Sequence, residues 1–186
     1  MVPFTSLLIP IILSAVLVFI ASSVIHMAMT YHRNDLRAVP NETAVMDAMR
    51  PFNLAPGDYA VPMAGSPAAM KDPAFMERMA RGPVLLMTVV PSGPVNMGQR
   101  LIRWFIYILV VSVFAGYVAS RALESGAVYL DVFRFAGTTA FCGYALALAQ
   151  NSIWWNRNWA MTLRSMFDGL IYALLTAGAF GWLWPR

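Results

Sequence analysis

The chain has 186 residues, of which 59% are hydrophobic and 12% are charged. A soluble domain of this length carries about 25% charged residues, so the composition excludes an ordinary water-soluble protein and indicates an integral membrane protein. The net charge of +4 comes from 13 Lys and Arg against 9 Asp and Glu. These basic residues are dispersed, and because nucleic acid requires a continuous basic surface, nucleic-acid binding is excluded as well.

Four stretches are long and apolar enough to cross a membrane as helices, since a span needs about 20 mostly apolar residues. They cover residues 5–28, 101–122, 127–149 and 162–184. Short connections join the last three spans, which are therefore expected to pack as antiparallel neighbours. The sequence predicts an all-α integral membrane protein, a four-transmembrane-helix bundle with an irregular α+β cytoplasmic insertion between helices 1 and 2.

Residues 29–99 form the insertion, and prolines interrupt it throughout. We expect short helices near residues 43–50 and 73–81. The second has Asp72 as its N-cap and Pro73 at its first helical position, and it ends at Gly82. The apolar run at residues 84–90 predicts a short buried strand, with residues 59–63 as its partner. So small a segment is marginally stable alone, so we expect it to lie against the membrane face or a partner.

Basic residues predict the orientation, because cytoplasmic loops of membrane proteins retain Lys and Arg. Ten of them fall on the side that holds residues 29–99 and the connection between the last two spans: Arg33, Arg37, Arg50, Lys71, Arg78, Arg81, Arg100, Arg103, Arg157 and Arg164. The other side has Arg121, Arg134 and Arg186. We expect a protein of a bacterial-type inner (plasma) membrane, with residues 29–99 cytoplasmic and both termini outside.

Ionisable groups inside membrane spans are energetically costly and mark candidate functional sites. On the last span, Arg164 and Asp168 lie four residues apart, and we expect Asp168 about one turn inside the cytoplasmic boundary. The tryptophan-rich stretch before this span, read as a polar hairpin, adds Gln150, Asn151 and Arg157. These five residues form a predicted polar cluster that faces the cytoplasm.

A second candidate site is the pair Asp131 and Arg134, at the outer end of the third span. In this pair, as in Arg164 and Asp168, the spacing places the acid and the base on one helix face. Each acid can therefore neutralise its own arginine. Local ion pairing is one interpretation of both pairs, and a polar pathway or a lipid-headgroup site is the other.

The two histidines, His26 and His32, lie near the inner end of the first span. Six residues correspond to about 600° of rotation on a continuous helix, which places the two rings on different faces. The sequence also has a single cysteine, Cys142. These observations predict no metal site and no cofactor.

Small residues recur at every fourth position of the last span, at Gly169, Ala173, Ala177 and Gly181. Such a stripe allows helix backbones to approach closely in lipid, where little hydrophobic force acts between helices. We expect a helix-packing seam, used within the chain or between subunits.

Standard catalytic motifs are missing from the sequence, including the Walker loop, His-Glu-x-x-His and Gly-x-Ser-x-Gly. The favoured hypothesis is therefore non-enzymatic: a structural or accessory subunit of a membrane complex, or a self-associating membrane protein, with the lipid bilayer and other membrane subunits or further copies as partners. The alternative is an oligomeric channel or transporter for a small solute or ion that uses Asp168. A third hypothesis, an enzyme acting on lipid headgroups, has only one carboxylate in the cluster for acid–base chemistry.

Overall fold

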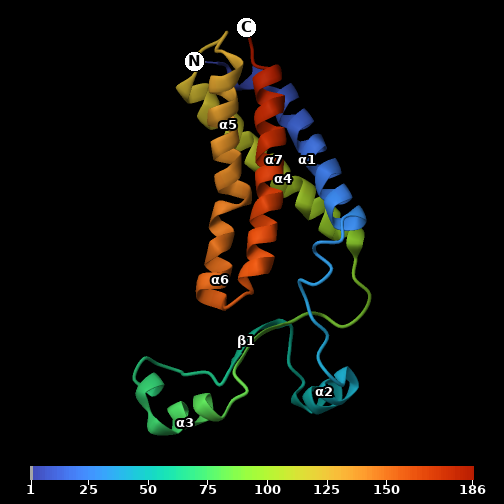
Figure 1. Ribbon diagram of the computed structural model, residues 1–186, viewed down its shortest axis with the longest axis vertical. Helices are drawn as coiled ribbons and strands as arrows, with labels where there is room; N and C mark the ends of the chain where they lie inside the picture. The colour runs from blue at the N-terminus through green and yellow to red at the C-terminus, as the bar shows by residue number, and fades with distance from the viewer. Residues whose placement is uncertain (1) are drawn as a thin grey trace. The chain divides into compact units, whose positions relative to one another are not determined.

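The computed structural model describes residues 2–186 and divides the chain into two units. Unit 1 comprises Met1–Leu36 and Asn96–Arg186, and unit 2 comprises Arg37–Val95. The protein is mostly helical, and the described residues contain one two-stranded sheet. Figure 1 shows the order of the elements along the chain.

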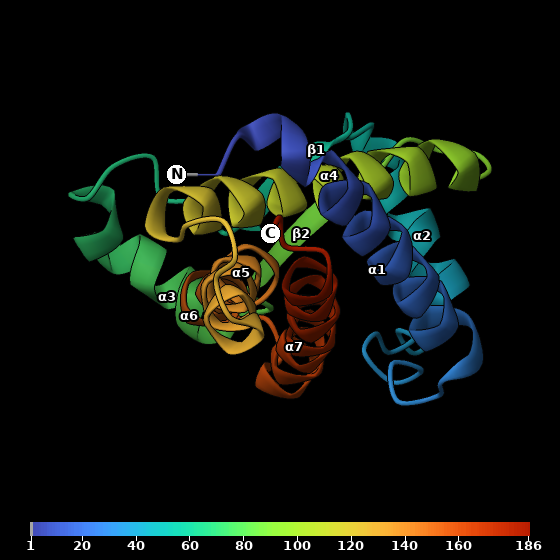
Figure 2. The same ribbon diagram turned by 90° about the horizontal axis from the view of Figure 1, so that it is seen from above.

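In the described part of unit 1, four long helices pack around one apolar core. They are α1 (Leu8–Ala28), which follows a 3-10 turn at Phe4–Leu7, α4 (Met97–Ala122), α5 (Tyr129–Tyr144) and α7 (Trp159–Trp182). Helix α5 packs on α7, α4 packs on α5, and α1 packs on both α7 and α4 (Figure 2). Each helix therefore contacts two others, and the side chains between them are buried, among them Ile11, Val18, Ile108, Val132 and Phe180.

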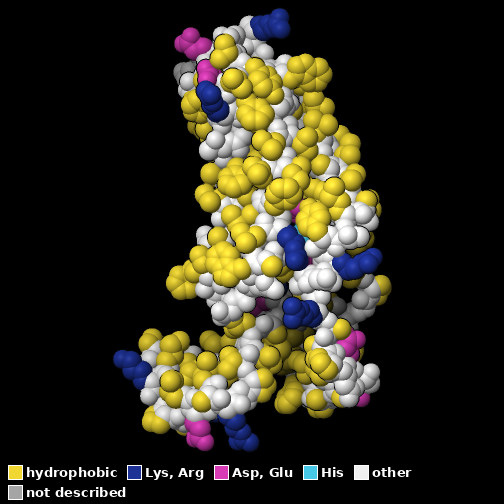
Figure 3. Space-filling model, in the orientation of Figure 1, with side chains coloured by type: hydrophobic (Ala, Val, Ile, Leu, Met, Phe, Trp, Pro, Cys, Tyr) yellow, Lys and Arg dark blue, Asp and Glu magenta, His cyan; other side chains and the backbone are white. Residues whose placement is uncertain are grey.

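Three segments of the described chain are long and apolar enough to cross a membrane: Phe4–Ala28, Met97–Ala122 and Tyr129–Trp155. Large apolar side chains such as Ile9, Ile20 and Phe114 are exposed on these segments. Figure 3 shows hydrophobic side chains along most of unit 1 on the face in view, with charged side chains toward its two ends. Lipid is the solvent that suits such a surface. A fourth crossing, by residues 162–184, stays a prediction.

Two of the long helices begin earlier than the hydropathy of the sequence suggests, because each has an asparagine cap. Asn96 Oδ1 accepts a hydrogen bond of 3.0 Å from the backbone N–H of Gln99, so α4 begins at Met97. Asn158 Oδ1 accepts one of 2.9 Å from Ala160, so α7 begins at Trp159. Such caps satisfy N–H groups that have no partner inside the helix.

The third predicted span is not one continuous helix. Helix α5 ends at Tyr144 and is followed by a 3-10 turn at Leu146–Leu148 and by α6 (Ala149–Trp155). At the break, the hydroxyl of Tyr107 donates a hydrogen bond of 2.5 Å to the carbonyl of Gly143. The tryptophan-rich stretch is therefore largely helical, and the turn between α6 and α7 is confined to residues 156–158, where Asn156 has a φ of 51°.

The small-residue seam of α7 packs against α5 and the turn that follows it. A Cβ atom added at Gly169 would lie 2.8 Å from the Cβ of Ala145, and one added at Gly181 would lie 2.7 Å from the Tyr129 ring. From the other side, a Cβ at Gly137 would lie 2.9 Å from the Cβ of Ala177. Contacts this close require glycine, so the seam serves packing within the chain.

Unit 2 contains short elements and almost no core. It comprises α2 (Glu42–Met49), a 3-10 turn at Arg50–Phe52, β1 (Gly57–Val61), a 3-10 turn at Ala69–Lys71, α3 (Pro73–Arg81) and β2 (Leu85–Val89). The strands are antiparallel, with Tyr59 opposite Met87. Asp72 Oδ1 caps α3 by accepting from Ala74 N at 2.9 Å. All residues of this unit are described, and Phe75 is its one buried hydrophobic side chain.

Candidate functional site

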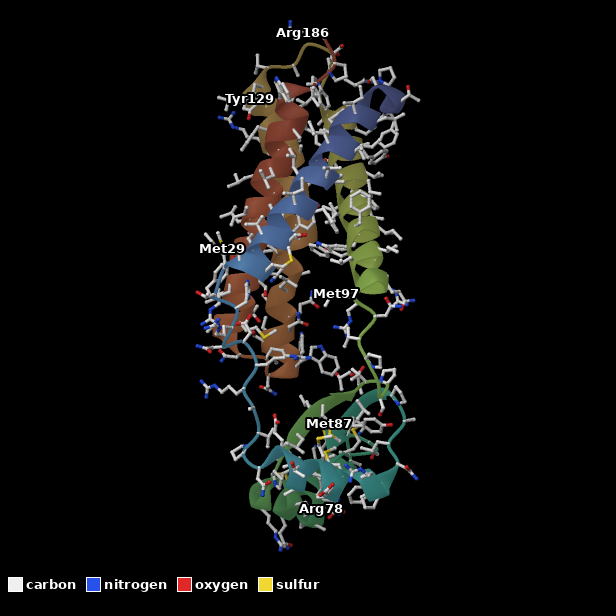
Figure 4. All side chains as sticks on the ribbon, turned by 90° about the vertical axis from the view of Figure 1, so that its right-hand side faces the viewer. Met29, Arg78, Met87, Met97, Tyr129 and Arg186 are labelled. Carbon is white, nitrogen blue, oxygen red and sulfur yellow. The ribbon has the colours of Figure 1, made fainter. Side chains whose placement is uncertain are left out.

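The candidate site forms where the chain leaves α1. The helix ends at Ala28, because Met29 adopts an extended conformation with φ −88° and ψ 142°. A turn follows, in which the N–H of Arg33 donates to the carbonyl of Thr30 at 3.0 Å. Met29 lies at the same end of unit 1 as Met97, whereas Tyr129 and Arg186 lie at the opposite end (Figure 4). The turn brings residues 31–35 against α7.

Asp168 of α7 is the centre of the site. It is 3% exposed, yet both of its carboxylate oxygens have partners. The hydroxyl of Tyr31 donates a hydrogen bond to Oδ1, and His32 Nε2 lies 2.7 Å from Oδ2. Both partners come from the turn after α1. They offset the free energy that is lost when a carboxylate leaves water, which amounts to several kcal/mol for an unpaired ion.

His32 connects Asp168 to a second ion pair. Its Nδ1 atom lies 2.6 Å from Asp35 Oδ2, and Arg164 of α7 donates to Asp35 Oδ1, also at 2.6 Å. Two acids and two bases therefore alternate, and with a protonated His32 their charges sum to zero. We call Tyr31, His32, Asp35, Arg164 and Asp168 the Asp168 network.

The pKa values in the turn follow from this pairing. Burial by itself lowers the pKa of His32, but its hydrogen bonds with Asp35 and Asp168 outweigh burial and raise the pKa above its usual value. Burial by itself raises the pKa of Asp35, but its hydrogen bonds with His32 and Arg164 lower the pKa below its usual value. Burial and the bond to Asp168 both raise the pKa of Tyr31. All three shifts favour a charged His32, a charged Asp35 and a neutral Tyr31 near pH 7.

The interpretation in which Arg164 and Asp168 form a local ion pair on α7 is wrong. The turn after α1 supplies a carboxylate to Arg164 and an imidazole to Asp168, and these longer-range partners replace the local pair. The second predicted pair does form. Arg134 Nη1 lies 3.4 Å from Asp131 Oδ1, and the Arg134 and Asp131 side chains are 71% and 47% exposed, so this is a weak surface ion pair.

The other members of the predicted polar cluster do not join Asp168. Asn151 and Arg157 line a separate pocket of about 240 Å³ at the turn between α6 and α7, together with Leu148, Met161, Thr162 and Ser165. Gln150 is exposed. The cluster therefore divides into two parts, because Asn151 and Arg157 belong to the α6–α7 turn whereas Arg164 and Asp168 face the turn after α1.

The prediction that the two histidine rings lie on different faces is also wrong. The helix does not continue to His32, because α1 ends between the two histidines and the turn brings their ring centroids to 4.9 Å. One ligand atom from each of His26, His32 and Asp168 lies within 4.8 Å of the other two. Among residues 2–186, these are the side chains whose arrangement suits a metal ion. A signal was present in the sequence, because Tyr31, His32 and Asp35 directly follow an apolar span.

No protein-family model matches the chain, and neither a curated protein nor a solved structure matches it. Chemically, the site offers a buried carboxylate, an imidazole held at both nitrogens and a phenol. These groups can fasten two segments together, bind a cation or transfer a proton.

Replacing Asp168 with Asn should lower the free energy of unfolding by about 3 kcal/mol, because the change removes the buried carboxylate that pairs with His32 and accepts from Tyr31. The matched control is Asp131→Asn in the exposed pair, which should cost less than about 1 kcal/mol. Denaturant titration of both variants in one detergent measures the difference. Equal losses would show that the Asp168 network adds no more to stability than a surface ion pair.

Proposed function

We propose that this chain is an accessory subunit of a membrane complex, anchored by unit 1 and bound to its partner through unit 2. The observation that carries the proposal is the apolar surface of unit 2. Large hydrophobic side chains are exposed there, including Phe52 at 72%, Met63 at 71% and Val90 at 62%. Soluble surfaces seldom carry so many apolar side chains together unless a partner covers them.

The architecture of unit 2 supports the same conclusion. A two-stranded antiparallel sheet is marginally stable in water without a covering element, and Leu85 and Leu86 of β2 are both exposed. Helix α3 buries Phe75 but leaves Met76 and Met79 exposed. Methionine suits a binding surface, because its flexible thioether adapts to the shape of a partner. The covering surface is therefore proposed to come from another subunit.

In this proposal, unit 1 is a four-helix bundle in a bacterial-type inner membrane. Three apolar segments support it, and α7 supplies the fourth helix by packing along α5 and α1. The ten basic residues on one side favour a cytoplasmic unit 2 and external termini. The seam of α7 is used within the chain, which leaves unit 2 as the surface for association.

The double variant Met76→Gln/Met79→Gln should release the partner, because it makes the exposed side of α3 polar while keeping helix propensity and side-chain length. The measurement is the mass of the native complex after extraction of the full chain in mild detergent. Wild type should run as an assembly, and the double variant should run mainly as the single chain.

The matched control is Glu77→Gln/Arg81→Gln, which changes the charged side of the same helix without changing the net charge. It should leave the assembly intact. The mass of the assembly also separates a second copy of this chain from a different subunit. A wild-type chain that is purely monomeric, with no partner, would contradict the proposal.

A proton or ion pathway is the second candidate, and a series of buried hydroxyl groups favours it. Tyr172 lies one turn from Asp168, and its buried hydroxyl has no hydrogen-bond partner among the described residues. The Tyr172 and Tyr144 rings are 5.7 Å apart, and the hydroxyl-bearing side chains of Ser112 and Thr176 are also buried. Ser14 donates to Ser112 at 3.1 Å, which extends the series to α1. Intramembrane polar residues of this kind mark ion pathways.

If this pathway conducts protons, Tyr172→Phe should lower the flux, because the change removes one hydroxyl and leaves the Asp168 network in place. The measurement is dye-reported proton entry into proteoliposomes under an imposed membrane potential. Tyr117→Phe is the control, since Tyr117 is exposed on α4. A wild-type flux equal to that of empty liposomes would rule the pathway out.

A further inference from the structure

We propose that His26, His32 and Asp168 form a binding site for a divalent first-row transition metal ion of the zinc class. The inference is independent of the accessory-subunit proposal, because all three residues belong to unit 1. Two imidazoles and one carboxylate are a ligand set that such ions favour. Mg²⁺ and Ca²⁺ require oxygen ligands instead, so the site is expected to discriminate against them.

The ligand atoms are already close enough for small movements to complete the site. A tetrahedral ion with bonds of about 2.0–2.1 Å holds its ligand atoms about 3.4 Å apart. His32 Nε2 and Asp168 Oδ2 are 2.7 Å apart, and all three ligand atoms lie within 4.8 Å of one another. His26 is exposed on the last turn of α1, so its ring is free to rotate toward the other two.

His32 and Asp168 are oriented as metal ligands usually are. Metal-bound histidines commonly donate their other ring N–H to a carboxylate, and metal-bound carboxylates accept further hydrogen bonds. Here Asp35 holds Nδ1 of His32 at 2.6 Å, which directs Nε2 toward Asp168. Tyr31 donates to Oδ1 of Asp168 and leaves Oδ2 for the ion. Arg164 in turn holds Asp35.

The bound ion would take the place of the hydrogen bond between His32 Nε2 and Asp168 Oδ2, and a protonated His32 would release its Nε2 proton on binding. Three protein ligands would leave the fourth position of a tetrahedral ion open for water or an anion, as they do in catalytic zinc sites. The turn after α1 would then be joined to α7 through the ion as well as through the ion pairs.

His26 separates this proposal from a purely structural role of the same residues. Without a bound ion, Asp168, His32 and Asp35 already stabilise the fold through their ion pairs. His26 is exposed and is not a member of the Asp168 network. The variant His26→Asn therefore removes one ligand and leaves every bond of the network intact, so its folding is expected to match wild type.

The experiment uses the full chain in mild detergent, purified with a histidine-free affinity tag and stripped of metal with a chelator. Co²⁺ is titrated as the spectroscopic probe and Zn²⁺ as its competitor, while calorimetry gives the stoichiometry. Mg²⁺ serves as the negative control ion. Thermal unfolding with and without Zn²⁺ provides a second readout, because an ion that binds the folded state raises the melting temperature.

We expect one ion per chain and a higher melting temperature with Zn²⁺. His26→Asn should weaken Co²⁺ binding by at least about 100-fold, and Asp35→Asn, which loses an orienting partner, by about 10–100-fold. Asp131→Asn should bind as wild type does. The proposal is overturned if wild type shows no saturable binding, or if His26→Asn binds the ion with wild-type affinity while melting normally.

Discussion

The need to compensate a buried carboxylate constrains this structure more than any other interaction. Asp168 lies on a helix that packs on two neighbours and is 3% exposed, so its charge requires partners from within the protein. Tyr31 and His32 supply them, which fastens the turn after α1 to α7. The same turn places Asp35 on Arg164. These ion pairs therefore fix the conformation of the segment that directly follows α1.

The two units differ in how completely they bury their apolar side chains and pair their buried charges. Unit 1 buries a continuous apolar core, packs its glycine seam internally and pairs its buried charges. Unit 2 has one buried hydrophobic residue, Phe75, and a two-stranded sheet. Hydrophobic side chains also gather over the part of unit 2 visible in Figure 3. A helical unit that buries its own core, joined to a unit that does not, is the combination that the proposed accessory subunit requires.

Local patterns were enough to predict most elements, but they did not predict the site. Hydropathy gave the apolar segments, and Asp72-Pro73 at one end with Gly82 at the other predicted the range of α3. The partners of Asp168 lie 136 and 137 residues away, and no spacing rule reaches that far. Hydropathy placed the end of the first span at Ala28, but no proline or glycine marks the turn that follows and brings His26 and His32 together. Tertiary contacts decide both features.

The most direct test of this account is a pair of double-mutant cycles on unfolding in detergent. One cycle uses Asp35→Asn and Arg164→Gln, and the other uses Asp131→Asn and Arg134→Gln at the exposed pair. We expect a coupling energy of about 1–2 kcal/mol in the first cycle, because Asp35 and Arg164 belong to the Asp168 network and are shielded from solvent. The second cycle should give about 0.3 kcal/mol. Equal coupling energies in the two cycles would contradict the central role given to the Asp168 network.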